Sequence, residues 1–173
     1  LTDIDYPSGG HITYVFNNKN QVTSVGGSGF SVSNITYNTT GTSIGLPKGF
    51  TYSNALTTEL TYTPRNLIKD IDVSGSVLDL VYAYDTRWNL TSVKNNLDPS
   101  KNQTFAYDKI NRLTSFNGPW GMGSYTYDAW GNRLKKVVGG IAPTYNYTGN
   151  RLSSTTGGEH FSFPYNSTGV AIY

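Results

Sequence analysis

The stretch Tyr127-Asp128-Ala129-Trp130-Gly131-Asn132-Arg133-Leu134 decides the fold, because variants of it recur along the whole chain. Neighbouring copies begin 18 to 25 residues apart. A phrase repeated at that period indicates an architecture built from one supersecondary unit used many times. The leading aromatic residues of the eight copies are Phe16, Tyr37, Tyr62, Tyr84, Tyr107, Tyr127, Tyr145 and Tyr165.

Each copy predicts a β-hairpin. In seven copies an apolar residue stands two positions before the aromatic one, so both point to the same face of a strand. Asp or Asn usually follows the aromatic residue and starts a turn by bonding to the backbone two residues on. Three positions later, seven copies have Gly or Asn, which tolerate a positive φ, and the eighth has Trp88. This pattern is typical of a type I turn closed by a left-handed residue. The signature residues are Tyr84, Asp85, Tyr107, Asp108, Tyr127, Asp128, Gly131, Tyr145, Gly149, Tyr165 and Gly169.

The composition agrees with an all-β fold. Ala, Glu and Met, which favour helices, total only nine residues, whereas Thr, Tyr and Gly are abundant. A lone hairpin is unstable in water, so the units are expected to pair edge to edge in one long, curled antiparallel sheet or shell segment. We expect a single array of about eight hairpins, on the order of sixteen strands, over residues 1–173 of a longer protein.

Composition also excludes several classes of protein. The chain has no cysteine, and therefore no disulfide framework, thiol catalysis or cysteine-based zinc site. Its longest apolar run, residues 80–84, is far short of the roughly 18 residues that indicate a membrane span. The 13 Lys and Arg residues are scattered and the formal net charge is +2, so no nucleic-acid partner is indicated.

The repeated phrase resembles the Tyr-Asp repeats, also called YD or Rhs repeats. The resemblance covers nearly the whole chain and includes the opening turn at residues 6–10 and the strand after it. It implies a sheet of hairpins that spirals into a hollow shell, as in teneurin adhesion receptors, insecticidal toxin complexes and bacterial polymorphic toxins. In the toxins, the resemblance implies, such a shell encloses a cytotoxic C-terminal domain.

The chain departs from the toxin branch of that family in one feature. The resemblance implies that a toxin shell ends in a self-cleaving aspartyl core with an Asp-Pro-x-Gly phrase. The Asp-Pro of this chain, Asp98-Pro99, is followed by Ser100 and Lys101, so that core is absent from these 173 residues.

Six Asn-x-Thr sequons are candidate N-glycosylation sites. Three of them replace the Asp of the repeat and are therefore expected at exposed turn tips, where a transferase has access. The alternative is that Asn is simply a favourable turn residue in an Asn- and Thr-rich chain. The six asparagines are Asn34, Asn38, Asn89, Asn102, Asn146 and Asn166, and the three at the turn position are Asn38, Asn146 and Asn166.

No pattern of catalytic or metal-binding residues stands out. His11 and His160 are 149 residues apart, which is not a metal-ligand spacing. The paired carboxylates at residues 3 and 5 and at 70 and 72 lie in no calcium-loop pattern and are expected on solvated strand faces. We therefore expect that the chain is not an enzyme and that it binds no cofactor and no metal.

The aromatic residues have two expected roles. The tyrosines are expected to pack as cross-strand aromatic ladders. Trp120 and Trp130 fall on predicted turns and are the best candidates for a binding surface.

Three functions are compatible with these features. The first is a non-enzymatic scaffold of an extracellular or cell-surface protein, which carries N-linked glycans and pairs through its sheet edges with identical subunits or with the rest of its parent chain, in a shell or filament. The second is a segment of a toxin-encapsulating Rhs shell, and the third is a carbohydrate-binding or adhesion module. The turn-tip sequons and the missing aspartyl core favour the first.

Overall fold

The computed structural model describes residues 2–158, which are all-β apart from one short 3₁₀ helix. Within these residues, fifteen strands form one antiparallel sheet in which the strand order is the order of the sequence, so the predicted fold class is confirmed. The elements are β1 (Asp3–Asp5), β2 (His11–Phe16), β3 (Val22–Gly27), β4 (Phe30–Tyr37), β5 (Pro47–Tyr52), β6 (Thr57–Tyr62), β7 (Ile68–Val73), β8 (Leu78–Tyr84), β9 (Leu90–Asn95), η1 (Pro99–Lys101), β10 (Gln103–Tyr107), β11 (Leu113–Gly118), β12 (Gly121–Tyr127), β13 (Arg133–Val138), β14 (Thr144–Thr148) and β15 (Arg151–Thr156).

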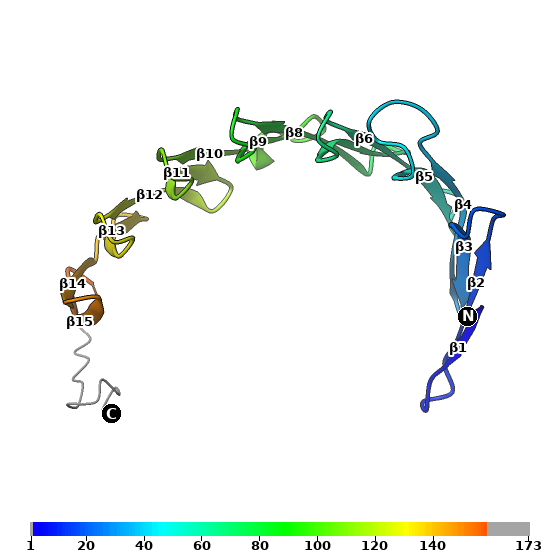
Figure 1. Cartoon of the computed structure of the whole chain (residues 1–173), viewed down its shortest axis with the longest axis horizontal. Helices are drawn as coiled ribbons and strands as arrows, with labels where there is room; N and C mark the ends of the chain where they lie inside the picture. The colour runs from blue at the N-terminus through cyan, green and yellow to red at the C-terminus, as the bar shows by residue number, and fades with distance from the viewer. Residues whose placement is uncertain (1, 159–173) are drawn as a thin grey trace. The chain divides into compact units, whose positions relative to one another are not determined.

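The chain divides into two compact units. The first comprises Leu1–Ala83 with Lys94–Pro99, and the second comprises Tyr84–Val93 with Ser100–Tyr173. Each is built from the same kind of hairpin, and within each the strands lie side by side in a single layer (Figure 1). That the whole chain behaves as a single array stays a prediction.

Side-chain alternation gives β6, β7 and β8 of the first unit one apolar face and one face with acidic side chains. Leu60 pairs with Ile71, and Ile71 pairs with Leu80, across three successive strands. Glu59 pairs with Asp72 one position along, and these carboxylates point to the opposite face. The predicted period of two is therefore confirmed in this part of the chain.

The apolar face of the second unit is closely packed around a glycine. Phe116 pairs with Phe105 on one side and with Gly123 on the other. The Phe116 ring covers Gly123 so closely that a Cβ on the glycine would lie 2.4 Å from Phe116 Cζ. The same ring lies 5.8 Å from the ring centroid of Tyr125. Gly123 thus provides the space that the neighbouring aromatic side chain occupies.

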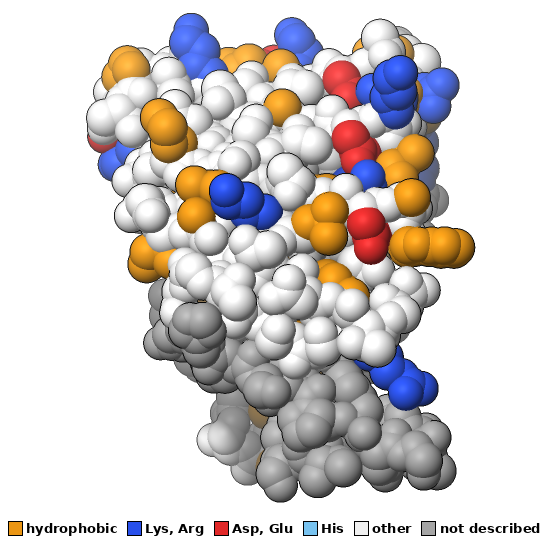
Figure 2. Space-filling model, turned by 90° about the vertical axis from the view of Figure 1, so that its left-hand side faces the viewer, with side chains coloured by type: hydrophobic (Ala, Val, Ile, Leu, Met, Phe, Trp, Pro, Cys, Tyr) orange, Lys and Arg blue, Asp and Glu red, His pale blue; other side chains and the backbone are white. Residues whose placement is uncertain are grey.

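A buried core is nearly absent from residues 2–158. The buried apolar side chains there are Val73 and Val93, each 7 % exposed. On the face drawn in Figure 2, hydrophobic side chains lie at the surface among polar and charged ones.

Trp120 and Trp130 lie on turns and are 57 % and 79 % exposed, as the sequence predicts. In the described part of the chain, no helix is long and apolar enough to cross a membrane.

Candidate assembly site: the Tyr-Asp turns

The Asp128 carboxylate organises the turn between β12 and β13. Its Oδ1 accepts hydrogen bonds from the backbone N–H of Trp130 at 2.9 Å and of Asn132 at 2.8 Å. Its Oδ2 accepts the Asn132 side-chain amide at 2.8 Å. The backbone N–H of Asp128 donates to the Asn132 carbonyl at 2.9 Å and closes the loop. The prediction that Asp starts the turn is confirmed, and its bonds reach the residues two and four positions on.

The same bonds recur in other copies of the repeat. Asp108 Oδ1 accepts the backbone N–H groups of Ile110 and Arg112, both at 2.9 Å. Asp85 makes the equivalent pair of bonds in the turn after β8. Asn17 uses its amide oxygen in the same way after β2. A single neutral oxygen is therefore enough to hold the two backbone groups, and the second oxygen of Asp adds a further contact.

Each described copy has a left-handed residue at the predicted position. Trp88, which departs from the Gly or Asn pattern, adopts a φ of 68°. Its backbone N–H donates to the Asp85 carbonyl at 3.0 Å, as Gly131 donates to Asp128 at 3.3 Å. Gly169 lies outside the described residues. The positive φ angles of the series belong to Asn20, Gly41, Asn66, Trp88, Asn111, Gly131 and Gly149.

Hydrogen bonds favour the ionised form of the turn carboxylates. The Asn89 side-chain amide, together with two backbone N–H groups, lowers the pKa of Asp85. The backbone N–H and the guanidinium of Arg112 lower the pKa of Asp108. At Asp128, desolvation acts to raise the pKa, but the hydrogen bonds outweigh it and the pKa is lowered. These turns are therefore held most firmly when the carboxylates are charged.

Side chains join neighbouring turns at one end of the strands of the second unit. Arg112 donates through Nε to Asp108 Oδ2 at 2.6 Å and through Nη1 to the Asp128 carbonyl at 2.8 Å. One arginine thus contacts two successive turns. The other links are Arg87 to the Lys109 carbonyl at 2.7 Å, Asn89 to Asn111 Oδ1 at 2.8 Å and Asn132 to Asn150 Oδ1 at 3.1 Å.

In four copies of the repeat, a tyrosine at the end of the outgoing strand ties its hairpin to the previous one. Tyr127 donates its hydroxyl to the Leu113 carbonyl at 2.9 Å. The equivalent bonds run from Tyr37 to Val22 at 2.7 Å, from Tyr62 to Pro47 at 2.7 Å and from Tyr147 to Arg133 at 3.0 Å. The expected aromatic ladder is therefore only a part of the packing: ring pairing occurs at Phe116 and Tyr125, but the hydroxyl bond is what recurs.

Arg133 lies against two tyrosine rings. Its guanidinium carbon is 4.4 Å from the ring centroid of Tyr145 and 5.8 Å from that of Tyr125. Its Nε is buried and has no hydrogen-bond partner. Arg112 lies over the Tyr127 ring at 4.6 Å in the same manner. Sequence reasoning missed this role, although the Arg that precedes Leu in these copies was a visible signal.

The placement of Asn146 at a turn tip is wrong. Asn146 lies within β14, and its side-chain amide donates to Ser154 Oγ at 3.1 Å. The turn of this copy lies at Gly149 and Asn150, because β14 pairs with β15 as far as Thr148. A register shift after Asn146 puts Tyr147, and not Tyr145, in the place that Tyr127 has in its own hairpin.

The remaining sequons lie in different surroundings. Asn38 begins a loop that runs to Leu46, whose carbonyl accepts its backbone N–H at 2.9 Å, so the short turn predicted there is also wrong. Asn34 is exposed in β4 with a φ of 51°. Asn89 and Asn102 are half-buried, and Asn166 lies outside the described residues. Whether any of these sequons is glycosylated stays a prediction.

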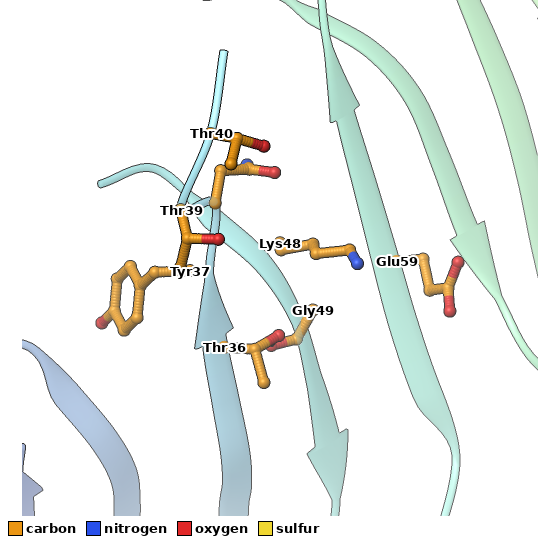
Figure 3. A pocket seen from close by; sticks show the side chains of 8 residues that line it. Thr36, Tyr37, Thr39, Thr40, Lys48, Gly49 and Glu59 are labelled. Atoms are coloured by element: carbon orange, nitrogen blue, oxygen red, sulfur yellow. The ribbon is translucent and has the colours of Figure 1, made fainter. Parts of the chain in front are cut away.

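A polar depression of about 370 Å³ lies beside the loop of residues 38–46, which connects β4 and β5 in the first unit. Lys48 from β5 and Glu59 from β6 bring opposite charges to it, and threonine hydroxyls face it from β4 and the loop (Figure 3). Its lining residues are Thr36, Tyr37, Asn38, Thr39, Thr40, Lys48, Gly49 and Glu59. The lining is polar and carries both charges.

His11 contacts the paired carboxylates of β1. Its Nδ1 lies 2.7 Å from Asp5 Oδ1, and its Nε2 lies 3.6 Å from Asp3 Oδ1. The hydrogen bond with Asp5 raises the pKa of His11. Among residues 2–158 no group of three or more His, Asp or Glu side chains is arranged to hold a metal ion. His160 lies outside the described residues.

Comparisons with known proteins show which solved structures have a similar fold. No family model matches the sequence, and no curated protein matches it. A chain of the Photorhabdus luminescens Tc holotoxin pore superposes with a TM-score of 0.72 at 18 % identity, over 99 % of this chain and 11 % of that one. The TcdB2-TccC3 crystal structure superposes with a TM-score of 0.66 at 16 % identity, over 94 % of this chain and 11 % of that one.

This chain is therefore much shorter than the proteins that it matches. It spans 11 % of the length of each of these chains. At such low identity the likeness concerns the backbone architecture alone. The chain has the fold of a segment of these Tc toxin proteins.

Proposed function

We propose that this chain is a YD/Rhs-type wall segment of a toxin-encapsulating shell and that it acts without catalysis. The observation that carries the proposal is a sheet with almost no buried core of its own, whose hairpins are locked to one another by repeated side-chain bonds. A repeat unit that does not bury its apolar face alone is stabilised by stacking on its neighbours. Such a sheet suits a continuous wall better than a ligand pocket.

The likeness to Tc toxin chains supports this function over the extracellular scaffold that the sequence favours. One candidate sequon also supports the choice. The Asn89 side-chain amide donates to Asp85 Oδ2 at 2.9 Å and to Asn111 Oδ1, so a glycan there would break two turn contacts. The proposed partner is the rest of a longer parent chain, joined through β1 and β15, which are the outermost strands of the sheet in the described residues. An extracellular location and attached glycans stay predictions.

The parent protein provides the test. Sequencing the reading frame that flanks these 173 codons is expected to show further Tyr-Asp hairpins, an Asp-Pro-x-Gly core and a C-terminal domain. Electron cryo-microscopy of that parent is expected to show a hollow particle. A surface anchor and an open filament would instead support the extracellular scaffold. A parent without further hairpins and without an enclosed space would overturn the proposal.

A further inference from the structure

An apolar groove of about 480 Å³ lies in the first unit where two connections meet. One connection follows β5 and the other follows β7. They are tied together because the Ser74 N–H donates to the Thr57 carbonyl and the Thr57 N–H donates to Ser74 Oγ, both at 2.9 Å. Val73 in the lining is 7 % exposed and Val77 is 56 % exposed. The lining residues are Tyr52, Ser53, Asn54, Leu56, Val73, Val77 and Leu78.

A pair of apolar side chains projects from the Tyr-Asp turns of the second unit. Ile110 and Trp130 occupy equivalent positions in successive turns and are 65 % and 79 % exposed. The backbone N–H of each is held by the Asp carboxylate of its turn. Arg112 links the two turns. Because these side chains stand on ordered turns, burying them costs little additional backbone entropy, and Trp is the residue type most enriched at binding hot spots.

The groove and the projecting pair belong to different kinds of connection. The groove is formed by connections that follow odd-numbered strands, whereas Ile110 and Trp130 lie in connections that follow even-numbered strands. Within an antiparallel meander, connections that follow odd-numbered strands and connections that follow even-numbered strands lie at opposite ends of the strands. One copy can therefore offer its groove while another offers its turns, which is a heterologous contact that can be repeated.

Charge favours the same pairing. The first unit has five basic and seven acidic residues, and the second has eight basic and four acidic residues. Asp72 and Asp79 pair with each other on the face of the sheet opposite the groove residues Val73 and Leu78, so the acidic charge belongs to the first unit as a whole and not to the groove lining. Lys109 adjoins Ile110, and Arg87 occupies in the preceding turn the position that Ile110 has in its own turn; both basic residues are exposed. Complementary charges of this kind steer two surfaces together and set their register.

We propose that the groove binds a second copy of this chain, which inserts Trp130 and Ile110 from its Tyr-Asp turns. In this contact, the connections after β10 and β12 of one copy lie against the connections after β5 and β7 of another. It does not depend on the chain being part of a toxin shell, so it can hold or fail separately from the proposed function.

Disulfide trapping tests the contact, because the chain contains no cysteine. A Val77→Cys variant is mixed with a Trp130→Cys variant under mild oxidation, and non-reducing electrophoresis measures the mixed dimer. The matched control is Trp120→Cys, since Trp120 also lies on an exposed turn of the second unit but in a connection that follows an odd-numbered strand. We expect at least tenfold more mixed dimer with Trp130→Cys than with Trp120→Cys. Equal yields would overturn the proposal.

Sedimentation of the cysteine-free chain provides an independent measurement. We expect concentration-dependent association that weakens with added NaCl and is lost in an Ile110→Ala/Trp130→Ala variant. Hydrogen exchange at β10–β13 verifies that this variant is folded; if it is not, Val77→Asp at the groove takes its place. Docking between copies would be refuted if the unsubstituted chain stays monomeric at every concentration. It would also be refuted if a folded variant associates as strongly as the unsubstituted chain.

Discussion

Replacing Gly123 with alanine tests whether the apolar face is closely packed although it lacks a second layer. The new Cβ would lie 2.4 Å from Phe116 Cζ and 2.6 Å from the Val137 carbonyl oxygen. Carbon atoms in contact are normally about 3.5–4.0 Å apart. The carbonyl belongs to the strand pair β12–β13, so its movement would weaken that pairing. The Phe116 ring is therefore expected to swing out and leave Tyr125.

The cost of Gly123→Ala has two parts. Overpacking of a well-packed site costs about 1–3 kcal/mol, and loss of the aromatic pair adds about 0.5–1.5 kcal/mol. Because the face is open to solvent, the ring has room to move, and we expect a total of roughly 1.5–3 kcal/mol. The matched control is Gly26→Ala in β3, where a Cβ would meet nothing within 4 Å. The control should gain up to about 1 kcal/mol, because alanine restricts the unfolded chain.

Hydrogen exchange on the intact chain measures both variants locally. Since 1.4 kcal/mol corresponds to a factor of ten, amides of β11–β13 are expected to exchange roughly ten- to a hundredfold faster in Gly123→Ala. Adding Phe116→Ala removes the ring from the clash, so the double variant should lose less than the sum of the two single losses. Strict additivity, or equal protection in the Gly123 and Gly26 variants, would refute the reasoning.

Four further predictions concern the turns. Tyr127→Phe removes the hydroxyl bond to the Leu113 carbonyl and should destabilise β11–β13 by about 0.5–1.5 kcal/mol in hydrogen exchange, whereas Tyr6→Phe, at an exposed turn, should have no measurable effect. Because the pKa values of Asp85, Asp108 and Asp128 are lowered, their stabilisation is complete above the pKa of an unfolded Asp and is lost as the pH falls through the folded pKa; carboxyl NMR titrations with midpoints at or above that of a free Asp would contradict this. Gly131→Asn should be nearly neutral, since Asn20 and Asn111 hold the same conformation, whereas Gly131→Val should cost about 1–2 kcal/mol in urea unfolding followed by tryptophan fluorescence; equal losses would count against the turn assignment. If the chain is expressed through a eukaryotic secretory pathway, peptide mapping should find Asn34 and Asn146 glycosylated ahead of Asn89, and the reverse order would show that side-chain exposure does not select the site.

The turns illustrate how much of the site local chemistry predicts. Asp108 and Asp128 were assigned from residue type and position alone, because the bonds that they accept come from residues two and four positions away. Trp88 breaks the Gly or Asn pattern, yet Asp85 imposes the same turn on it. Where a turn is held by near neighbours, one unsuitable residue does not abolish it.

The hairpin of β14 and β15 shows where such prediction stops. Tyr145 and Tyr147 are two residues apart, so a strand presents both to the same face, and Asn146 and Gly149 make Tyr145 the better match to the repeat. A slip of two residues changes no face and leaves no trace in the hydrophobic pattern. The choice is made by the pairing of β14 with β15 and by the bond from Tyr147 to the carbonyl of Arg133, which belongs to the previous hairpin.

Sequence alone determined that this chain is a series of β-hairpins. It also determined that Asp begins the turns, that a residue with a positive φ closes them, and that side chains alternate between the two faces of each strand. Those features depend on residues within a few positions of one another. The tertiary structure alone decided which turns are linked and which tyrosine rings Arg133 stacks on. It also decided which sequons lie outside the predicted turns and where an apolar groove lies between two connections. Those features depend on residues that strand pairing brings together, and their spacing follows from register, bulges and loop lengths that no single copy of the repeat contains.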